Sequence, residues 1–83
     1  MNLYFFHLRD GIDILLDPEG REVDRVDQIA DIALREARAI IRHDVDSGTI
    51  YLDKHIDVED AFGTIIHRLP FADAVAIIAA EIE

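Results

Sequence analysis

Apolar and polar side chains alternate near the start of the chain, and this pattern predicts a β-hairpin. In residues 3–9, which are rich in aromatic residues, alternation places Tyr4, Phe6 and Leu8 on one face and Phe5, His7 and Arg9 on the other. Asp10-Gly11 favours a tight turn, and the apolar run over residues 12–16 is the second strand. The sequence Asp17-Pro18-Glu19-Gly20 ends that strand, because proline cannot donate a hydrogen bond to a β-ladder.

The middle of the chain has a helical period. Asp24 is placed to cap the first turn, and Ser47-Gly48 supplies the stop signal. Apolar residues between these positions recur at i, i+3, i+4 and i+7, which predicts one apolar stripe that faces a sheet. Alanines in the stripe let the helix lie close to the strands, and we expect Phe6 and Leu8 to be contacted by Ile29, Ala33, Ala37 and Ile40.

A second hairpin and a short helix are predicted after residue 48. The strands cover residues 50–60 and 64–69, the turn is Asp60-Ala61-Phe62-Gly63, and Pro70 closes the second strand. Residues 71–83 form the short helix, with one apolar side made of Val75, Ile78, Ala79 and Ile82.

Together these elements predict a single α+β domain over residues 1–83. The order is ββαββα, with an antiparallel four-stranded sheet made from two hairpins and one long helix packed on it. The long helix covers only one face of this sheet. Phe5 and either Ile65 or Ile66 point toward the other face, so we expect something else to cover them.

The composition narrows the class of protein. With 83 residues and no cysteine, the chain has a small core and neither disulfides nor thiolate metal ligands to support it, which favours a homo-oligomer. The first residues lack the basic start of a signal peptide, and no apolar run approaches the ~20 residues of a membrane span. We therefore expect a cytoplasmic protein that does not enter a membrane.

The net charge of −10, from 18 acidic and 8 basic residues, argues against nucleic-acid binding. Such binding depends on lysines and arginines that neutralise phosphates. An acidic surface keeps a small protein soluble. It also favours a basic protein partner, whose nucleic-acid site the acidic chain can occupy by mimicking phosphates.

The histidines are the main candidates for chemistry. The sequence has four histidines, His7, His43, His55 and His67. None of them is spaced from another metal-binding residue so that two ligands would lie on one helical face. If His7 and His67 lie on adjacent strands and face the same way, they form a pair with Asp10 or Asp57 nearby, suited to a metal ion or a pH-sensitive interface. A histidine on the surface or at a dimer face is the favoured interpretation.

The other polar residues do not meet the requirements of a catalytic or binding site. The sequence context that activates a hydroxyl group is missing at Ser47, Thr49 and Thr64. The sequence also lacks a glycine-rich phosphate loop. The spacing of a calcium loop is absent, so a solvated acidic turn is the favoured interpretation of Asp57, Glu59 and Asp60. We expect no catalytic residue, no metal and no cofactor.

Four sequence motifs resemble those of a known family. They are YFFHLRDG at residues 4–11, DPEG at residues 17–20, IDVED at residues 56–60 with Gly63, and LPFADAV at residues 69–75. Together they resemble a family of small bacterial proteins known only as a domain of unknown function, and the resemblance covers most of the chain. It implies no activity, ligand or catalytic residue.

Three functions are consistent with these observations. The first is a small non-enzymatic protein-interaction module that self-associates and binds through its sheet face or an edge strand, with candidate interaction residues Phe5, His7, Arg9 and His67. The second is an acidic inhibitor, antitoxin-like or nucleic-acid-mimicking, that occupies a basic site on a partner. The third is a small metal-dependent or hydrolytic enzyme that uses His7 and His67.

Overall fold

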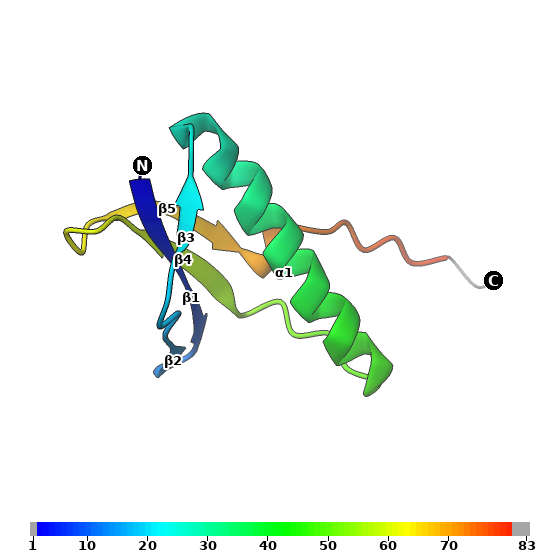
Figure 1. Cartoon of the computed structure of the whole chain (residues 1–83). Helices are drawn as coiled ribbons and strands as arrows, with labels where there is room; N and C mark the ends of the chain where they lie inside the picture. Colours follow the sequence, from blue (N-terminus) through cyan, green and yellow to red (C-terminus); the bar gives the residue numbers. More distant parts are fainter. Residues whose placement is uncertain (1, 81–83) are drawn as a thin grey trace.

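The computed structural model of this protein, which describes residues 2–80, has one long helix lying across one face of a five-stranded antiparallel sheet (Figure 1). In chain order the elements are β1 (Asn2–Asp10), β2 (Asp13–Leu15), β3 (Arg21–Val23), the 3₁₀ turn η1 (Val26–Gln28), α1 (Ile29–Asp46), β4 (His55–Glu59), β5 (Ile65–Pro70) and the 3₁₀ turn η2 (Phe71–Asp73). The strands lie in the order β2-β1-β4-β5, and β3 also pairs with β1. The predicted α+β class and antiparallel sheet are confirmed.

The predicted four-stranded sheet in the order ββαββα is wrong in two places. A further strand, β3, pairs with the first part of β1 before the helix begins. After β5 only the turn η2 forms, and residues 75–80 have no helix where the apolar period predicts one. The remainder of that expected helix, including Ile82, lies outside the described residues.

After β5, Phe71 and Ala74 hold a short stretch of the chain against the body of the protein. Both are buried, and the Ala74 carbonyl oxygen accepts a hydrogen bond from Arg38 Nε at 2.8 Å. Beyond them Ile77 and Ile78 are exposed, and the chain runs away from the helix and the sheet (Figure 1). A short helix is marginal without an apolar surface to pack on, so the amphipathic period alone does not form it.

The long helix begins later than predicted. Arg25, rather than Asp24, is the extended residue before the first turn, and that turn is the 3₁₀ segment η1. Gln28 closes the turn, because its side-chain oxygen accepts a hydrogen bond from the Arg25 N–H at 3.4 Å. The end of the helix agrees with the prediction, since α1 stops at Asp46 and Gly48 has the positive φ that follows many helices.

Residues 49–54 form no strand, although the apolar pattern predicts one from residue 50. Lys54 explains the difference. Its ammonium group lies 3.3 Å from the Asp44 carboxylate of α1 and 4.6 Å from the centroid of the Tyr51 ring. These contacts fix the connection to the end of the helix, and the strand starts only at His55.

The core lies between α1 and one face of the sheet. Ala33 and Ala37 are fully buried, which confirms that small side chains let the helix lie close to the strands. Near the end of the helix Ile41 is buried, and the expected Ile40 is partly buried beside it. The strands and turns supply the remaining buried apolar residues Tyr4, Val23, Ile56, Val58, Phe71 and Ala74. The side chains that are partly buried and pack against this core include the expected Phe6, Leu8 and Ile40.

We expect Ala33→Leu to lower the free energy of unfolding by about 1–3 kcal/mol. Ala33 is 0 % exposed, so a larger side chain must displace the helix or the strands. Chemical denaturation measures the change. Ala39→Leu, at an exposed position of the same helix, is the control and should move the midpoint little. An unchanged midpoint for Ala33→Leu would show that this face of the helix is not packed on the sheet.

Candidate functional site

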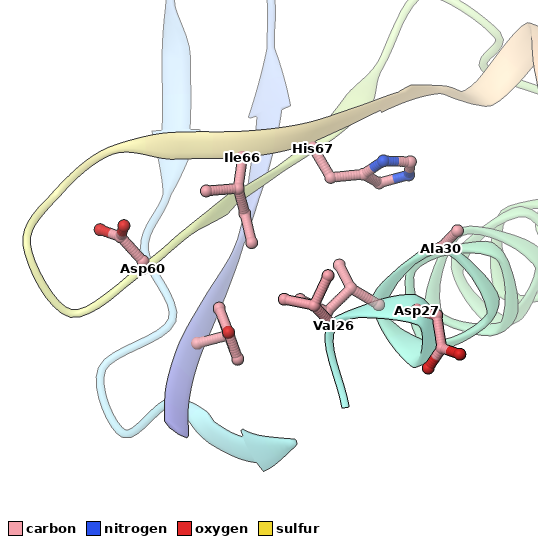
Figure 2. Close-up of a pocket in the computed structure, with 8 residues that line it drawn as sticks. Val26, Asp27, Ala30, Asp60, Ile66 and His67 are labelled. Carbon is pink, nitrogen blue, oxygen red and sulfur yellow. The ribbon is translucent and has the colours of Figure 1, made fainter. Parts of the chain in front are cut away.

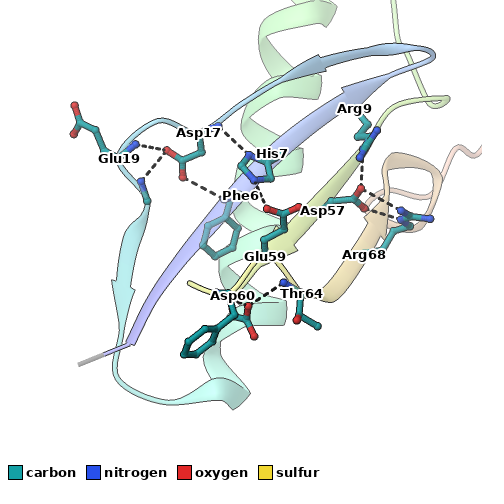
Figure 3. Close-up of polar contacts among 12 residues, drawn as sticks. Phe6, His7, Arg9, Asp17, Glu19, Asp57, Glu59, Asp60, Thr64 and Arg68 are labelled. Carbon is teal, nitrogen blue, oxygen red and sulfur yellow. Dashed lines mark hydrogen bonds and ion pairs between the residues drawn. The ribbon is translucent and has the colours of Figure 1, made fainter.

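β2 and β3 act as one strand that is interrupted beside the middle of β1. Leu15 of β2 lies opposite Leu8, and Arg21 of β3 lies opposite Tyr4. Residues 16–20 therefore face only residues 5–7 of β1, and the two extra residues open the ladder into a loop. The loop contains the DPEG motif. It contacts the face of the sheet opposite α1, which we call the outer face (Figure 3).

The Asp17 carboxylate takes the place of the missing strand along this stretch of β1. Its Oδ2 accepts a hydrogen bond from the Phe6 N–H at 3.2 Å, and its Oδ1 accepts from the N–H groups of Gly20 at 3.1 Å and Glu19 at 3.4 Å. Burial acts to raise the pKa of Asp17, but the hydrogen bonds from these N–H groups outweigh it, so this pKa lies below its usual value. An ionised Asp17 therefore holds the loop and the strand together at neutral pH.

His7 fastens the same loop from the outer face. The Asp17 N–H donates to His7 Nδ1 at 3.0 Å, so Nδ1 carries no proton and Nε2 carries the N–H of the neutral ring. That N–H donates to Glu59 Oε2 of β4 at 3.1 Å. His7 is 6 % exposed. Because both ring nitrogens join the loop to β4, neither is free to bind a metal ion or to accept a proton from a substrate.

Gly20 lets the loop close over Phe5. Its φ is +73°, and a Cβ at this position would lie 2.9 Å from the Phe5 ring and 3.0 Å from the Tyr4 carbonyl oxygen. The Phe5 ring also stacks on His7, with ring centroids 6.2 Å apart and an angle of 11° between the planes. The loop is therefore the cover that Phe5 needs on the outer face.

Asp17, His7 and Glu59 form the first charged cluster of the outer face. A second charged cluster on this face is centred on Asp57 of β4, which is 1 % exposed. Arg9 Nε donates to Oδ2 at 2.9 Å, while Arg68 donates through Nε to Oδ1 at 2.6 Å and through Nη2 to Oδ2 at 3.1 Å (Figure 3). Burial acts to raise the pKa of Asp57, but the hydrogen bonds from Arg68 and Arg9 outweigh it, so this pKa lies below its usual value. The interpretation of Asp57 as part of a solvated turn is wrong, because β4 places it in the interior of the sheet.

His55 lies at the edge of this cluster. Its Nε2 atom is buried and has no hydrogen-bond partner among residues 2–80. Asp57 Oδ1 is 3.6 Å away, which is too long for a hydrogen bond, although His55 still helps to lower the pKa of Asp57. Asp57 therefore has hydrogen bonds from two arginines and a histidine close by.

A separate hollow of about 460 Å³ lies on the helix side of the sheet, where α1 begins. Figure 2 shows Ile66 of β5 pointing across it toward Val26 of η1, while the His67 side chain extends toward α1 near Ala30. The lining is completed by Tyr4, Asp27, Ile29, Ala30 and Asp60. The two charged clusters contribute no residue to this lining, so the hollow is a distinct feature of the surface.

Three of the four predicted interaction residues, Phe5, His7 and Arg9, lie together on the outer face of β1. Alternation along β1 places them on the same side, and each belongs to one of the clusters described above. Phe5 stacks on His7, which binds Glu59, and Arg9 binds Asp57.

His67 lies on the other face. It is opposite Val58 of β4, which is itself opposite Phe6 of β1, and side chains of directly opposite residues share a face. His67 therefore points toward α1 and the hollow. The condition for a pair of His7 and His67 is not met, because β4 lies between their strands and the two side chains face opposite ways.

Sequence reasoning missed the roles of Asp17, Glu59 and Arg68. The signal for Asp17 is present, because an aspartate before Pro18 is typical of a turn in which the carboxylate accepts nearby N–H groups. No local signal identifies Glu59 or Arg68. Their partners lie on neighbouring strands, and the register that brings them together depends on the whole sheet.

In the part of the chain that the structure describes, no group of three or more histidine, aspartate or glutamate side chains is arranged to hold a metal ion. No helix in residues 2–80 is long and apolar enough to cross a membrane. On the outer face, His7 binds Glu59, and Arg9 and Arg68 bind Asp57.

The model of one family, described as a domain of unknown function (DUF6894), matches residues 3–72. The matched range contains both charged clusters and the hollow. It confirms the expectation of a domain of unknown function over most of the chain. No curated protein and no solved structure matches the chain.

We expect Asp57→Asn to lower the free energy of unfolding at pH 7 by about 1–3 kcal/mol. A neutral amide cannot replace the carboxylate between two guanidinium groups, and the substitution leaves Arg9 and Arg68 without their anion. Urea denaturation measures the loss. Asp53→Asn, an exposed position before β4, makes the same change of charge and should alter the stability little.

The stability of Asp57→Asn should depend less on pH in the acid range than the stability of the wild type. The pKa values of Asp17 and Asp57 lie below the ~3.9 of a free aspartate, so their stabilising contribution is complete above about pH 5 and is lost as the pH falls through the folded-state pKa values. Between about pH 5 and pH 2, the stability of the wild type should therefore fall more steeply than that of Asp57→Asn. Equal slopes would show that Asp57 does not contribute as an ionised group.

Proposed function

The chain belongs to the DUF6894 family, a domain of unknown function, and we propose from the geometry of its residues that it is a small non-enzymatic protein-interaction module that self-associates. The main support is the free edge of β5. Within residues 2–80, β5 pairs only with β4, so its other edge has no partner strand. Such an edge is a template for a strand from another chain.

The charged clusters support a structural role rather than a catalytic one. A general base or nucleophile needs an atom that is free to reach a substrate. Both ring nitrogens of His7 are used within the chain, and the Asp57 carboxylate is enclosed by two guanidinium groups. Each cluster joins neighbouring strands, which is what a rigid binding scaffold requires.

The backbone of β5 presents hydrogen-bonding groups at its free edge. The Phe71 N–H donates to the Lys54 carbonyl oxygen at 2.9 Å, one position beyond the His55–Pro70 pair that ends the ladder, and this bond gives the phase of the hydrogen-bonded pairs between β4 and β5. Such pairs recur at every second residue of an antiparallel ladder, and the N–H and carbonyl groups of Arg68 therefore point to the free edge. Pro70 has no N–H to offer there, which limits pairing to the first part of β5.

The opposite edge of the sheet is interrupted. β2 and β3 are each three residues long, and the loop of residues 16–20 separates them. Proline and a break in the ladder are both devices that prevent an edge from pairing with another chain, and this loop contains both. β5 has six residues and one charged side chain, Arg68, so we place the self-association there.

The charge pattern also favours β5. Two copies with a net charge of −10 repel each other. Residues 61–72 contain no aspartate or glutamate, and they form the longest such stretch in the sequence. Pairing through β5 therefore brings two acidic molecules together where their repulsion is weakest, and the exposed Ile65 adds apolar contact.

A second candidate function is that of an acidic inhibitor, antitoxin-like or nucleic-acid-mimicking, which binds a basic site on a partner. The observation that favours it is the excess of acidic over basic residues. This function uses the acidic surface of the chain, whereas self-association uses its acid-free strand.

We expect the wild type to be a dimer and Ile65→Lys to dissociate it. Ile65 is 42 % exposed, so the monomer accepts a lysine there, whereas lysines from two copies repel each other at a shared edge. The dimer Kd should rise at least about tenfold, equivalent to about 1.4 kcal/mol. Sedimentation velocity over a dilution series measures this change.

Ile14→Lys is the matched control for this experiment. Ile14 is 40 % exposed and lies on β2, at the interrupted edge, so the variant should dimerise as the wild type does. A wild-type monomer at high micromolar concentration would contradict self-association. Equal dissociation of both variants would show that the interface is not at β5.

Salt separates the two candidate functions. At high ionic strength, screening weakens the repulsion between two acidic copies and also weakens the attraction between an acidic inhibitor and a basic partner. Raising NaCl from about 50 mM to about 500 mM should therefore tighten self-association several-fold. Binding to a basic partner protein should weaken over the same range. A self-association that weakens with salt would contradict contact through the acid-free strand.

A further inference from the structure

We propose that the hollow at the start of α1 binds one apolar side chain of a basic segment of another protein, whose lysines or arginines lie against Asp27 and Asp60. This inference rests on the proposed role as a protein-interaction module, and it is independent of the contact through β5. It assigns a second partner and names its chemistry.

The hollow has the size and the lining for an apolar side chain. Its volume of about 460 Å³ exceeds the ~300 Å³ at which ligand sites begin. Tyr4 and Ile29 are buried members of the lining, whereas Val26 and Ile66 are exposed. Figure 2 shows Ile66 facing Val26 across the space, with the His67 ring on the side of α1 near Ala30. The apolar walls remain in contact with water unless a partner fills the hollow.

The ends of the hollow select a positively charged partner. Asp60 and Asp27 stand at opposite ends, with their carboxylates turned away from the interior (Figure 2). Asp60 Oδ1 accepts hydrogen bonds from the Phe62 and Thr64 N–H groups, so a partner's cation would bind through Oδ2. The lining, as far as the described residues form it, includes no lysine or arginine. Asp27 lies 3.1 Å from Arg25, but both side chains are exposed, and a pair this exposed is weak enough for a second cation to share the carboxylate.

Charge complementarity favours a basic segment over the other possible occupants. A second copy of the chain would bring a net charge of −10 to this acidic rim. The apolar residues 75–80 of the same chain run away from the body beyond Ala74, which Arg38 holds further along α1 (Figure 1). A segment that combines an apolar anchor with lysine or arginine matches both the lining and the rim.

The test uses the full chain and three synthetic peptides of about 12 residues. The first places lysines and arginines around a central Leu-Phe pair, the second replaces that pair by serines, and the third keeps the pair but replaces the basic residues by glutamates. NMR titration of the isotope-labelled protein reports binding at single backbone amides. We expect the first peptide to shift the amides of Val26, Ala30 and Ile66 and to bind at least about tenfold more tightly than the other two, with an affinity that falls as salt rises.

Two matched pairs of variants locate the contact. Ala30→Trp fills the hollow and should abolish binding of the first peptide, whereas Ala39→Trp, also at an exposed position of α1, should not. Asp27→Asn should weaken binding about threefold, while Asp46→Asn, exposed at the far end of α1, should leave it unchanged. Circular dichroism confirms that each variant is folded.

The outcomes distinguish this inference from self-association. Equal binding of the serine peptide, or undiminished binding by Ala30→Trp, would overturn the proposal. In a further titration, the concentration of Ile65→Lys is raised without any peptide. If the amides that line the hollow then shift, a second copy of the chain is the occupant, and this result would also overturn the proposal. Ile65→Lys should bind the first peptide as the wild type does, whether or not the wild type is a dimer.

Discussion

Along the middle of β1, the carboxylate of Asp17 supplies the acceptor that a neighbouring strand would otherwise provide. It binds the Phe6 N–H and two N–H groups of its own loop, while its own N–H binds His7. His7 is thereby committed to one tautomer and to Glu59, so β1 is joined to β4 by side chains as well as by the ladder. The same anchor lets the chain leave β2, cross the outer face and return to β1 as β3. Because β3 leads directly into η1, the position of the helix over the sheet also depends on it.

The two faces of the sheet are stabilised in different ways. On the helix side, the burial of small and branched apolar side chains such as Ala33, Ala37 and Val58 supplies the core. On the outer face there is no second helix in residues 2–80, and charged side chains shield one another instead. Arg9 and Arg68 reach Asp57 from the strands on either side of it, and their guanidinium groups bind its carboxylate. A two-layer domain can thus bury an aspartate on its open face.

The sequence predicted those parts of the fold that depend on the conformation of neighbouring residues. The alternation in β1, the turn at Gly11, the alanines of the α1 stripe and the stop at Gly48 each follow from the conformation of a few consecutive residues. β3 has only three residues, and it pairs because two inserted residues shift the register. Alternation in β4 correctly places Asp57 on the other face of the sheet from Ile56 and Val58. It cannot show that arginines from β1 and β5 meet at Asp57. The predicted helix after β5 failed for a related reason, since its period has no surface to pack on.

The interruption between β2 and β3 also determines how large an assembly built from this sheet can become. Under the proposed pairing, two copies join through β5 about a two-fold axis, and both open edges are consumed at once. The outer boundaries of the joined sheet are then the two interrupted edges, each with a loop containing Asp17 and Pro18 where a third strand would have to add. Growth therefore stops at two copies, and the two inserted residues protect a chain with an uncovered β-edge from forming fibres.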